Sequence, residues 1–167
     1  MVIGTDHQPE DDFERFIALP TEAQGIIILA IGAKIHAFVA AQNFGRVGVH
    51  ILHHVPQDRQ NYRLPDISFT ADTTTPVVTA GAVLRLPDLA VEVKSPSDSY
   101  RQMRDKADYY LANGVKLVWL VYPEKRIIVS YVASGEIQLL NEADALEGGD
   151  VLPGFSMAVS EVFLAVA

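Results

Sequence analysis

The sequence of 167 residues contains no cysteine. This absence excludes disulfide bonds, cysteine nucleophiles and cysteine-ligated zinc or iron–sulfur sites. Long apolar runs are also lacking, because the most apolar run, residues 26–31, ends at Gly32 and is far shorter than the roughly 20 residues that span a bilayer. The first ten residues lack the basic and apolar regions of a secretory signal. We therefore expect a soluble, cytoplasmic protein.

Positive charge is scarce. The chain has 13 Lys and Arg against 21 Asp and Glu, a net charge of -8, which disfavours bulk binding to nucleic acid or anionic membranes. The deficit lies at the ends: residues 1–24 and 136–167 together carry a net charge of -11, whereas residues 25–135 carry +3. Acidic ends that only keep the protein soluble are one explanation. If the substrate is a polyanion, the middle of the chain is where it should bind.

The hydrophobic fraction, 49%, is sufficient for a buried core, and the length suits one domain over residues 1–167, with residues 1–10 as a candidate disordered segment. The apolar spacing predicts a helix, three strands, a second helix and a strand, followed by a hairpin extension. The helices are expected at about residues 11–17, 21–42, 97–113 and 160–164, and the strands at 47–55, 65–70, 89–93, 115–122, 126–132 and 136–140. A turn-rich connection is expected between the first two strands, at residues 56–63. Helices around a central mixed sheet make an α/β sandwich.

The helix predicted at residues 21–42 starts with a T-x-x-Q capping box formed by Thr21 and Gln24. A stripe of helical spacing joins Glu22 to His36, and we expect this stripe to face the core. Glu22 would then look into a site. The alternative is an ordinary first-turn glutamate favoured by the helix dipole.

The strand predicted at residues 89–93 contains Glu92 and is followed by Lys94, although a buried strand is expected to be apolar. Period-two alternation puts Glu92 and Lys94 on the same face, opposite Val91 and Val93. Burying an ionised Glu and Lys is costly unless they are paired or bind a metal. A plain exposed strand face is the alternative.

A second carboxylate, Asp66, follows Pro65 at the entry of another predicted strand. If the two strands are neighbours, Asp66, Glu92 and Lys94 converge. Two carboxylates suit hard Mg²⁺, which keeps several waters and binds substrate phosphate. A lysine beside them could act on the attacking water.

These residues resemble a known pattern. Pro65-Asp66, then Glu92-x-Lys94 on the next core strand, a helix and a buried strand are similar to the PD-(D/E)XK nuclease superfamily, whose common core is αβββαβ. The longer strings LPDISF, PDLAVEVKSPSDSYRQMRDKADYYLANGVKLVWLVYPEKRIIVSY and GGDVLPGFSMAVSEVF resemble the Uma-two family of restriction endonuclease-like proteins within it. The similarity spans about Asp11 to Phe163. It implies a restriction endonuclease-like αβββαβ core, with a central mixed sheet flanked by helices and a C-terminal β-hairpin extension.

The resemblance also implies roles for individual residues. Asp66, Glu92 and the main-chain carbonyl of Val93 would hold Mg²⁺ or Mn²⁺. Lys94 would orient or deprotonate water and offset charge in the transition state. Many members of the family lack a lysine at the position of Lys94, whereas this chain keeps the full set.

Two secondary candidates follow from the same resemblance. Lys106 matches a lysine typical of the family and would pair toward the site or contact phosphate, unless it lies on a solvated helix face. Glu22 occupies the position of the acidic first-helix residue of many superfamily members.

Other groups of polar residues give weaker evidence for a functional site. His50 and His54 are too far apart along one predicted strand, roughly 13 Å, to share a metal. Ser97 or Ser99 is expected to cap the following helix, since no histidine partner is evident. Basic residues of that helix could touch a nucleic-acid backbone or simply be solvated; they are Arg101, Arg104 and Lys106.

The sequence therefore predicts a Mg²⁺- or Mn²⁺-dependent endonuclease that hydrolyses phosphodiester bonds of DNA with a metal-activated water. A catalytically inactive binding or assembly module with the nuclease fold is the alternative, and a hydrolase of smaller phosphate esters is a third. We also expect a homodimer, sealed by apolar residues in the loop 77–86 and in the C-terminal VFLAVA.

Overall fold

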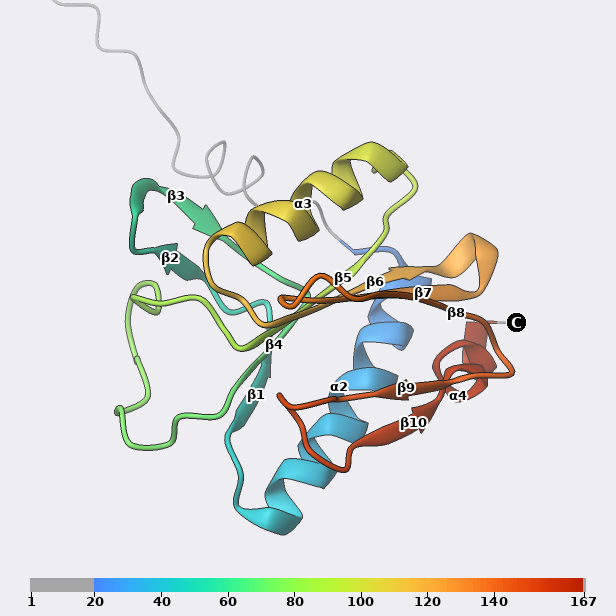
Figure 1. The fold of residues 1–167 in the computed structure, drawn as a ribbon, viewed down its shortest axis with the longest axis horizontal. Coiled ribbons are helices and arrows are strands. Elements are labelled where there is room, and N and C mark those ends of the chain that lie inside the picture. Colours follow the sequence, from blue (N-terminus) through green and yellow to red (C-terminus); the bar gives the residue numbers. More distant parts are fainter. Residues whose placement is uncertain (1–19, 167) are drawn as a thin grey trace, which may run out of the picture.

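The computed structural model describes residues 20–166, so the helix expected at residues 11–17 and the candidate disordered segment 1–10 lie outside the described residues. A six-stranded sheet forms the centre of the fold (Figure 1). Its strands, in spatial order, are β1 (Arg46–Val49), β4 (Ile67–Thr70), β5 (Leu89–Val93), β6 (Leu117–Tyr122), β7 (Ile127–Val132) and β8 (Ile137–Leu140). β5 and β6 are parallel and the other neighbours are antiparallel. This mixed sheet confirms the expected α/β class and the β7–β8 hairpin extension.

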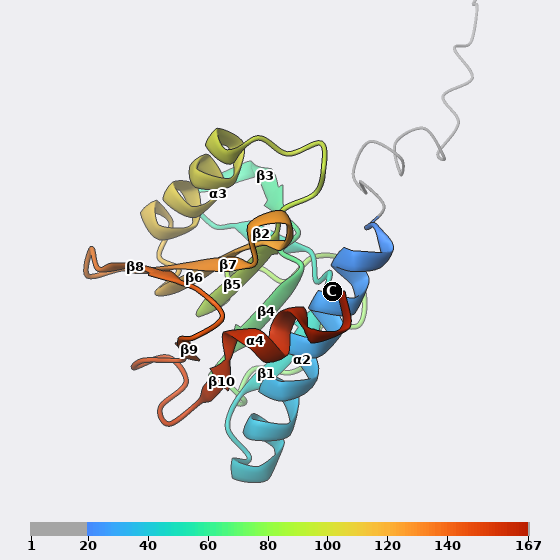
Figure 2. The same ribbon diagram turned by 90° about the vertical axis from the view of Figure 1, so that its right-hand side faces the viewer.

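Helices cover both faces of the sheet (Figure 2). α2 (Glu22–Gln42) and the short α4 (Val159–Phe163) pack on one face, and α3 (Tyr100–Ala112) packs on the other. Side chains alternate along β5 and so contribute to the cores on both faces of the sheet. Val91 and Val93 enter the core under α2, and Ala90 enters the core under α3. Glu92 has the parity of Ala90, so its carboxylate is directed toward α3.

α2 begins with the expected capping box, in which Thr21 Oγ1 accepts from the Gln24 amide. The expectation that the stripe from Glu22 to His36 faces the core is wrong. Those two residues are exposed. The helix is apolar nearly all round, and its core contact is made instead by the stripe of Ile27, Ile31, Ile35 and their neighbours, which are fully buried against the sheet.

Length and composition alone would allow α2 to cross a membrane, and it is the one such helix in the part of the chain that the structure describes. Some of this apolar composition packs against the sheet through isoleucines such as Ile27 and Ile31, and 33% of the apolar window is buried.

The strand expected at residues 47–55 is interrupted. β1 ends at Val49, His50 takes a left-handed conformation with φ 49°, and β2 (His53–Val55) follows in a separate hairpin with β3 (Asp58–Arg63). The turn-rich connection expected at residues 56–63 is therefore mostly strand. This polar segment has no apolar alternation to mark it, and most of its described side chains are exposed.

The C-terminal region contains a further hairpin that the sequence did not suggest. β9 (Ala145–Glu147) pairs with β10 (Ser156–Ala158), and both are too short for a periodic signal. Residues 151–155 form turns between them. The short 3-10 turns η1 (Pro123–Lys125) and η2 (Leu164–Val166) complete the elements.

The proposed apolar surface at VFLAVA needs a correction. Val162 and Phe163 are buried in the core beneath α2, because α4 packs on that helix. They cannot seal an interface between copies. Leu164 remains 76% exposed, as does Leu84 in the other expected interface segment.

Candidate active site

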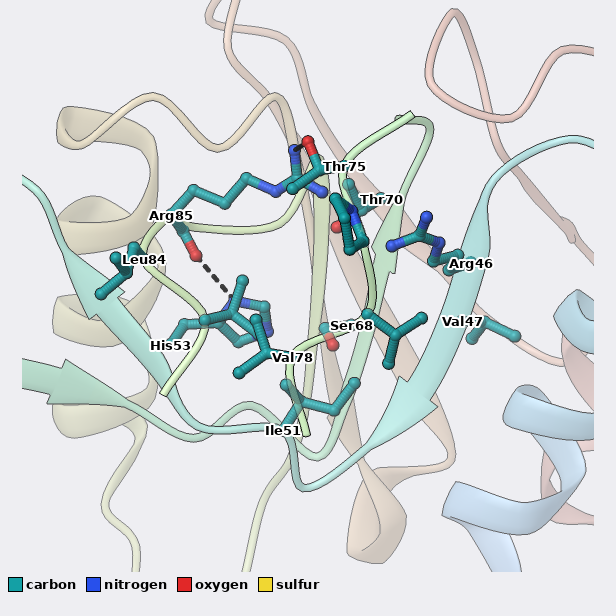
Figure 3. A pocket seen from close by; sticks show the side chains of 13 residues that line it. Arg46, Val47, Ile51, His53, Ser68, Thr70, Thr75, Val78, Leu84 and Arg85 are labelled. Carbon is teal, nitrogen blue, oxygen red and sulfur yellow. Dashed lines mark hydrogen bonds between the residues drawn. The ribbon is translucent and has the colours of Figure 1, made fainter. Parts of the chain in front are cut away.

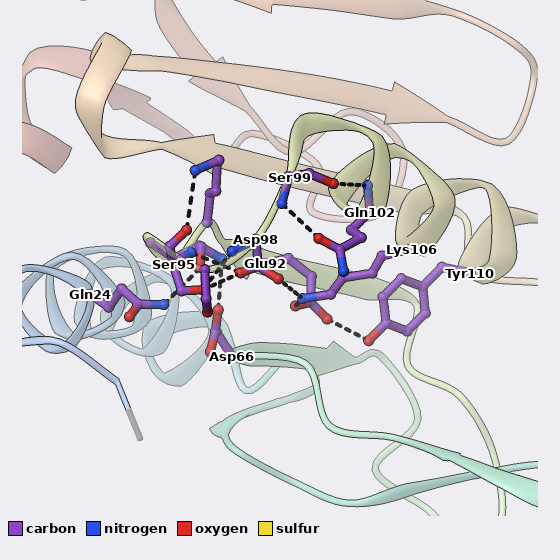
Figure 4. A network of polar contacts seen from close by, with 12 residues as sticks. Gln24, Asp66, Glu92, Ser95, Asp98, Ser99, Gln102, Lys106 and Tyr110 are labelled. Carbon is purple, nitrogen blue, oxygen red and sulfur yellow. Dashed lines mark hydrogen bonds and ion pairs between the residues drawn. The ribbon is translucent and has the colours of Figure 1, made fainter. Parts of the chain in front are cut away.

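Asp66 and Glu92 lie on neighbouring strands at the same level. The antiparallel register pairs Ile67 with Val91, and its next step places Asp66 opposite Glu92. The contact is fixed by the Val93 amide, which donates to Asp66 Oδ2 at 2.7 Å. The two carboxylates predicted from the sequence are thus brought together, at the end of β5 that faces the start of α3 (Figure 4).

Glu92 is only 6% exposed, and both of its carboxylate oxygens are engaged by α3. Tyr110 Oη donates to Oε1 at 2.7 Å, and Lys106 Nζ donates to Oε2 at 3.0 Å. Burial raises the pKa of Glu92 and the nearby Asp66 adds to this effect, while Lys106 and the Tyr110 hydroxyl oppose it. Glu92 is a desolvated carboxylate whose charge depends on a neighbouring cation.

Lys106 is that cation. Its ammonium lies 3.0 Å from Glu92 Oε2 and 3.7 Å from Asp98 Oδ1. Burial alone would lower the pKa of Lys106, but the charges of Glu92, Asp98 and Asp66 raise it overall. The sequence left two alternatives for Lys106, the site or a solvated helix face. The structure directs its side chain into the site.

Asp66 has a histidine neighbour that the sequence analysis set aside. His50 Nε2 lies 3.4 Å from Asp66 Oδ1. Burial raises the pKa of Asp66, opposed by the hydrogen bond from the Val93 amide and by the charges of His50 and Lys106. His50 reaches Asp66 because the chain turns at this residue after β1, and that turn has no signal in the sequence.

The main-chain carbonyl of Val93, a predicted metal ligand, accepts a hydrogen bond from Gln24 Nε2 at 3.0 Å. The same Gln24 side chain caps α2, since its Oε1 accepts from the Thr21 amide at 2.9 Å. The start of α2 therefore reaches the site through Gln24, whereas Glu22 points to solvent.

Lys94 does not contact the two carboxylates. Its ammonium donates to the Ser95 carbonyl at 3.1 Å and pairs with Glu124 Oε1 at 3.3 Å. Its side chain is 10% exposed. Among the described residues, the ammonium that touches the carboxylate pair is therefore Lys106.

The turn between β5 and α3 positions Lys106. Asp98 Oδ2 accepts from the Ser95 amide at 2.9 Å and from the Ser95 hydroxyl at 2.6 Å, which closes the turn. Ser99 then caps α3 with Gln102 as its partner, as expected. Arg101, on the outer side of this helix, is highly exposed and lies 3.9 Å from Asp105, so this part of the basic cluster is a solvated face.

An open cleft of about 540 Å³ leads to Glu92 and Lys106 between α3 and the end of β3. Its walls are tied together by Tyr109, whose hydroxyl donates to Asp58 Oδ2 at 3.1 Å and whose ring lies 3.6 Å from the guanidinium of Arg63. The half-buried Arg63 is the second cation of the cleft besides Lys106, and the other charged residues that line it are acidic.

The donor set suits a hard divalent cation. Two carboxylates and one carbonyl are oxygen ligands, and Mg²⁺ commonly binds to one or two carboxylates and keeps its remaining waters. Within residues 20–166 there is no cluster of three or more His, Cys, Asp or Glu side chains arranged around a common point, so water or substrate would have to complete the shell. The Lys106 ammonium now lies on Glu92, and the metal would have to displace it.

Comparison with known proteins gives the family. The model of the Uma2 family, described as "Putative restriction endonuclease", matches residues 10–160. The chain belongs to the Uma2 family. Its fold is similar to the crystal structure of "a putative nuclease belonging to DUF820" from Anabaena variabilis, with a TM-score of 0.78 at 18% identity, over 89% of this chain and 84% of that one. At this identity the likeness shows the fold. No curated protein matches the chain.

Membership in the Uma2 family confirms the resemblance drawn from the sequence, and the fold confirms the αβββαβ core. Four residues at the site were not singled out by the sequence as site residues: Gln24, His50, Asp98 and Tyr110. Gln24 was expected only as part of the capping box with Thr21, which gave no reason to assign it a second role.

Proposed function

We propose that this Uma2 protein is a divalent-metal-dependent endonuclease that hydrolyses phosphodiester bonds of DNA. The observation that carries the proposal is the pairing of Asp66, directly before β4, with the buried Glu92 on β5. Glu92 also lines a cleft that opens to solvent. The family description, "Putative restriction endonuclease", supports the choice of substrate.

Asp66, Glu92 and the Val93 carbonyl would hold the Mg²⁺ or Mn²⁺. When bound, the metal supplies an activated water and neutralises charge on the phosphate. Burial raises the pKa of Glu92 because the ionised carboxylate is poorly solvated. The carboxylate would therefore bind strongly to a cation that offsets its charge.

Two lysines, Lys106 and Lys94, would act in the reaction, one on the phosphate and the other on the water. Lys106 is at hydrogen-bond distance from Glu92 and, once displaced, lies at the cleft wall where it can contact the phosphate. Lys94 would act by leaving Glu124 and turning toward the reacting water. Arg63 would bind a flanking phosphate in the cleft.

A second candidate, an inactive nuclease-fold module, is favoured by one observation. Lys106 and Tyr110 satisfy both oxygens of Glu92, and Gln24 satisfies the Val93 carbonyl, so the predicted ligands already have protein partners. In such a module the ammonium of Lys106 would permanently replace the metal.

The experiment is cleavage of supercoiled and linear DNA by the purified protein with Mg²⁺, Mn²⁺ or EDTA. Nicking that needs the metal and falls at least a hundredfold in Asp66→Asn and Glu92→Gln supports the nuclease. The matched control is Glu147→Gln, which alters an exposed glutamate on β9. Absence of both metal binding and cleavage would favour the inactive module, and cleavage that persists in Asp66→Asn would exclude the assigned site.

A further inference from the structure

A second cavity lies on the same sheet face as the carboxylates. It has a volume of about 440 Å³ and is formed by β1, β2, β4 and the loop that precedes β5 (Figure 3). Its walls are mainly apolar, with Ile51, Val78 and Val83 among the lining residues. Volumes of this size are typical of small-molecule sites.

One residue of the cavity wall, His53, has a buried polar atom without a partner among the described residues. His53 is 2% exposed, its Nδ1 lies 2.8 Å from the Arg85 carbonyl, and within residues 20–166 its Nε2 has no hydrogen-bond partner. A carbonyl can only accept, so Nδ1 carries the proton and Nε2 presents a lone pair. Burial lowers the pKa of His53, which keeps the ring in this neutral form. The missing partner of Nε2 is therefore a hydrogen-bond donor.

The loop that forms one wall of this cavity is held in place by its own hydrogen bonds and an ion pair. Asp72 accepts hydrogen bonds from the Thr74 amide at 2.7 Å and from the Thr74 hydroxyl at 2.6 Å, and it pairs with Arg85. The loop is also joined to β2, because the His54 amide donates to the Val83 carbonyl at 2.7 Å. A pre-ordered wall lowers the entropic cost of binding a ligand.

The cavity adjoins the carboxylate site. Ser68 lines it and follows Asp66 by two residues on β4, so the two side chains share a face at a spacing of about 7 Å. The segment after β1 also links the sites, since His50 contacts Asp66 while Ile51 and His53 line the cavity.

We propose that this cavity binds an unpaired nucleobase of the nucleic-acid strand whose phosphate lies at Asp66 and Glu92. A base has the flat shape and N–H donors that apolar walls and one deep acceptor recognise. Arg46, at the rim, donates to the Thr73 carbonyl at 2.8 Å and brings positive charge where the strand's phosphates would pass. The proposal rests on the proposed function for the identity of the strand, but its test does not require cleavage.

Two substitutions separate the two nitrogens of His53. In His53→Asn the amide can keep the bond to the Arg85 carbonyl while the cavity loses its acceptor. In His53→Gln the longer side chain can place an oxygen near the position of Nε2. Val78→Trp fills the cavity from the loop, and Leu139→Trp is its control on the exposed edge strand β8. Thermal unfolding checks that each variant is folded.

The test is binding of fluorescent single-stranded DNA hexamers in EDTA, with an abasic site placed at each position in turn. For the wild type we expect one position at which the abasic site weakens binding about tenfold, the effect of losing the hydrogen bond that the base donates to His53 Nε2. His53→Asn and Val78→Trp should bind the intact strand about tenfold more weakly and lose that position dependence. His53→Gln should retain it at least in part, and Leu139→Trp fully.

Equal losses at every position in wild type and His53→Asn, or no binding of DNA at all, would overturn the proposal. Free nucleosides at millimolar concentration are a separate arm: binding of nucleosides but not of hexamers would show a nucleotide site unconnected with a strand and would overturn it too. Position-dependent binding without metal-dependent cleavage would keep this inference and reject the nuclease. Cleavage without position dependence would do the opposite.

Discussion

The ammonium of Lys106 on α3 lies 3.0 Å from Oε2 of Glu92 on β5, so a helix supplies the charge that the buried strand carboxylate requires. Lys94, only two residues from Glu92, pairs elsewhere. A cation in contact with one proposed metal ligand must compete with the metal for it. This relationship leads to the first prediction.

Replacing Lys106 by Met should strengthen Mn²⁺ binding and weaken cleavage. The substitution removes the ammonium that now occupies Glu92 Oε2, and we expect about a tenfold lower Kd for Mn²⁺, equivalent to about 1.4 kcal/mol. Electron paramagnetic resonance of Mn²⁺ measures the Kd without any turnover. Lys34→Met, on the far side of α2, is the matched control. An unchanged or higher Kd in Lys106→Met would mean that Lys106 does not compete with the metal.

Glu92→Gln should stabilise the folded protein at alkaline pH. Burial raises the pKa of Glu92 above its unfolded value, so the native state binds the proton more tightly and loses stability as the pH rises through the folded pKa. Glutamine has no charge to bury, and its advantage should grow between pH 5 and pH 8 to about 1 kcal/mol.

Urea unfolding at the two pH values measures this difference, with the exposed Glu147→Gln as the control that should show none. A Glu92→Gln protein that is less stable than wild type at pH 8 would show that the bonds from Lys106 and Tyr110 outweigh the cost of burial.

The substitution Gln24→Glu should make the thermal stability of the protein depend more strongly on added metal. Its carboxylate keeps an acceptor for the Thr21 amide but meets the Val93 carbonyl with no donor, which should cost about 1–2 kcal/mol. Added Mn²⁺ would gain a third carboxylate nearby. We expect a lower Tm without metal and a larger rise in Tm with Mn²⁺ than in wild type. The exposed Glu22→Gln should change neither, and equal metal-induced shifts in Gln24→Glu and wild type would contradict the prediction.

His53 should make the protein sensitive to mild acid. Burial lowers the pKa of His53 below 6.5, so the unfolded chain takes up a proton that the folded protein does not. Stability is complete above the unfolded pKa and is lost as the pH falls from about 6.5 toward the folded pKa. His53→Asn should therefore lose less stability than wild type between pH 7 and pH 5, measured by urea unfolding. Parallel losses would assign the acid sensitivity to other groups.

The central strand and its charges were predictable because their signals are local. Five consecutive residues of β5 are buried, and alternation alone puts Glu92 opposite to Val91 and Val93. The Pro65-Asp66 entry to β4 marks the second carboxylate. Both signals agree with the long strings shared with the Uma2 family.

The parts that failed depend on contacts between distant segments. A nearly uniform apolar helix such as α2 gives no angular signal, so the sequence favoured Glu22 when the side chain that reaches the site is Gln24. The left-handed turn at His50 and the pairing of the polar strand β3 with β2 have no signal in the apolar spacing. The choice between Lys94 and Lys106 depends on the direction in which α3 leaves its cap at Ser99, which only the folded chain determines.

The measurement that tests the central claim most directly is a crystal structure of the protein with Mn²⁺, with the ion located by anomalous scattering. The account predicts one ion within coordination distance of both Asp66 and Glu92, with Lys106 displaced from Glu92 Oε2. An anomalous map without an ion between these carboxylates at millimolar Mn²⁺, with Lys106 still on Glu92, would contradict it.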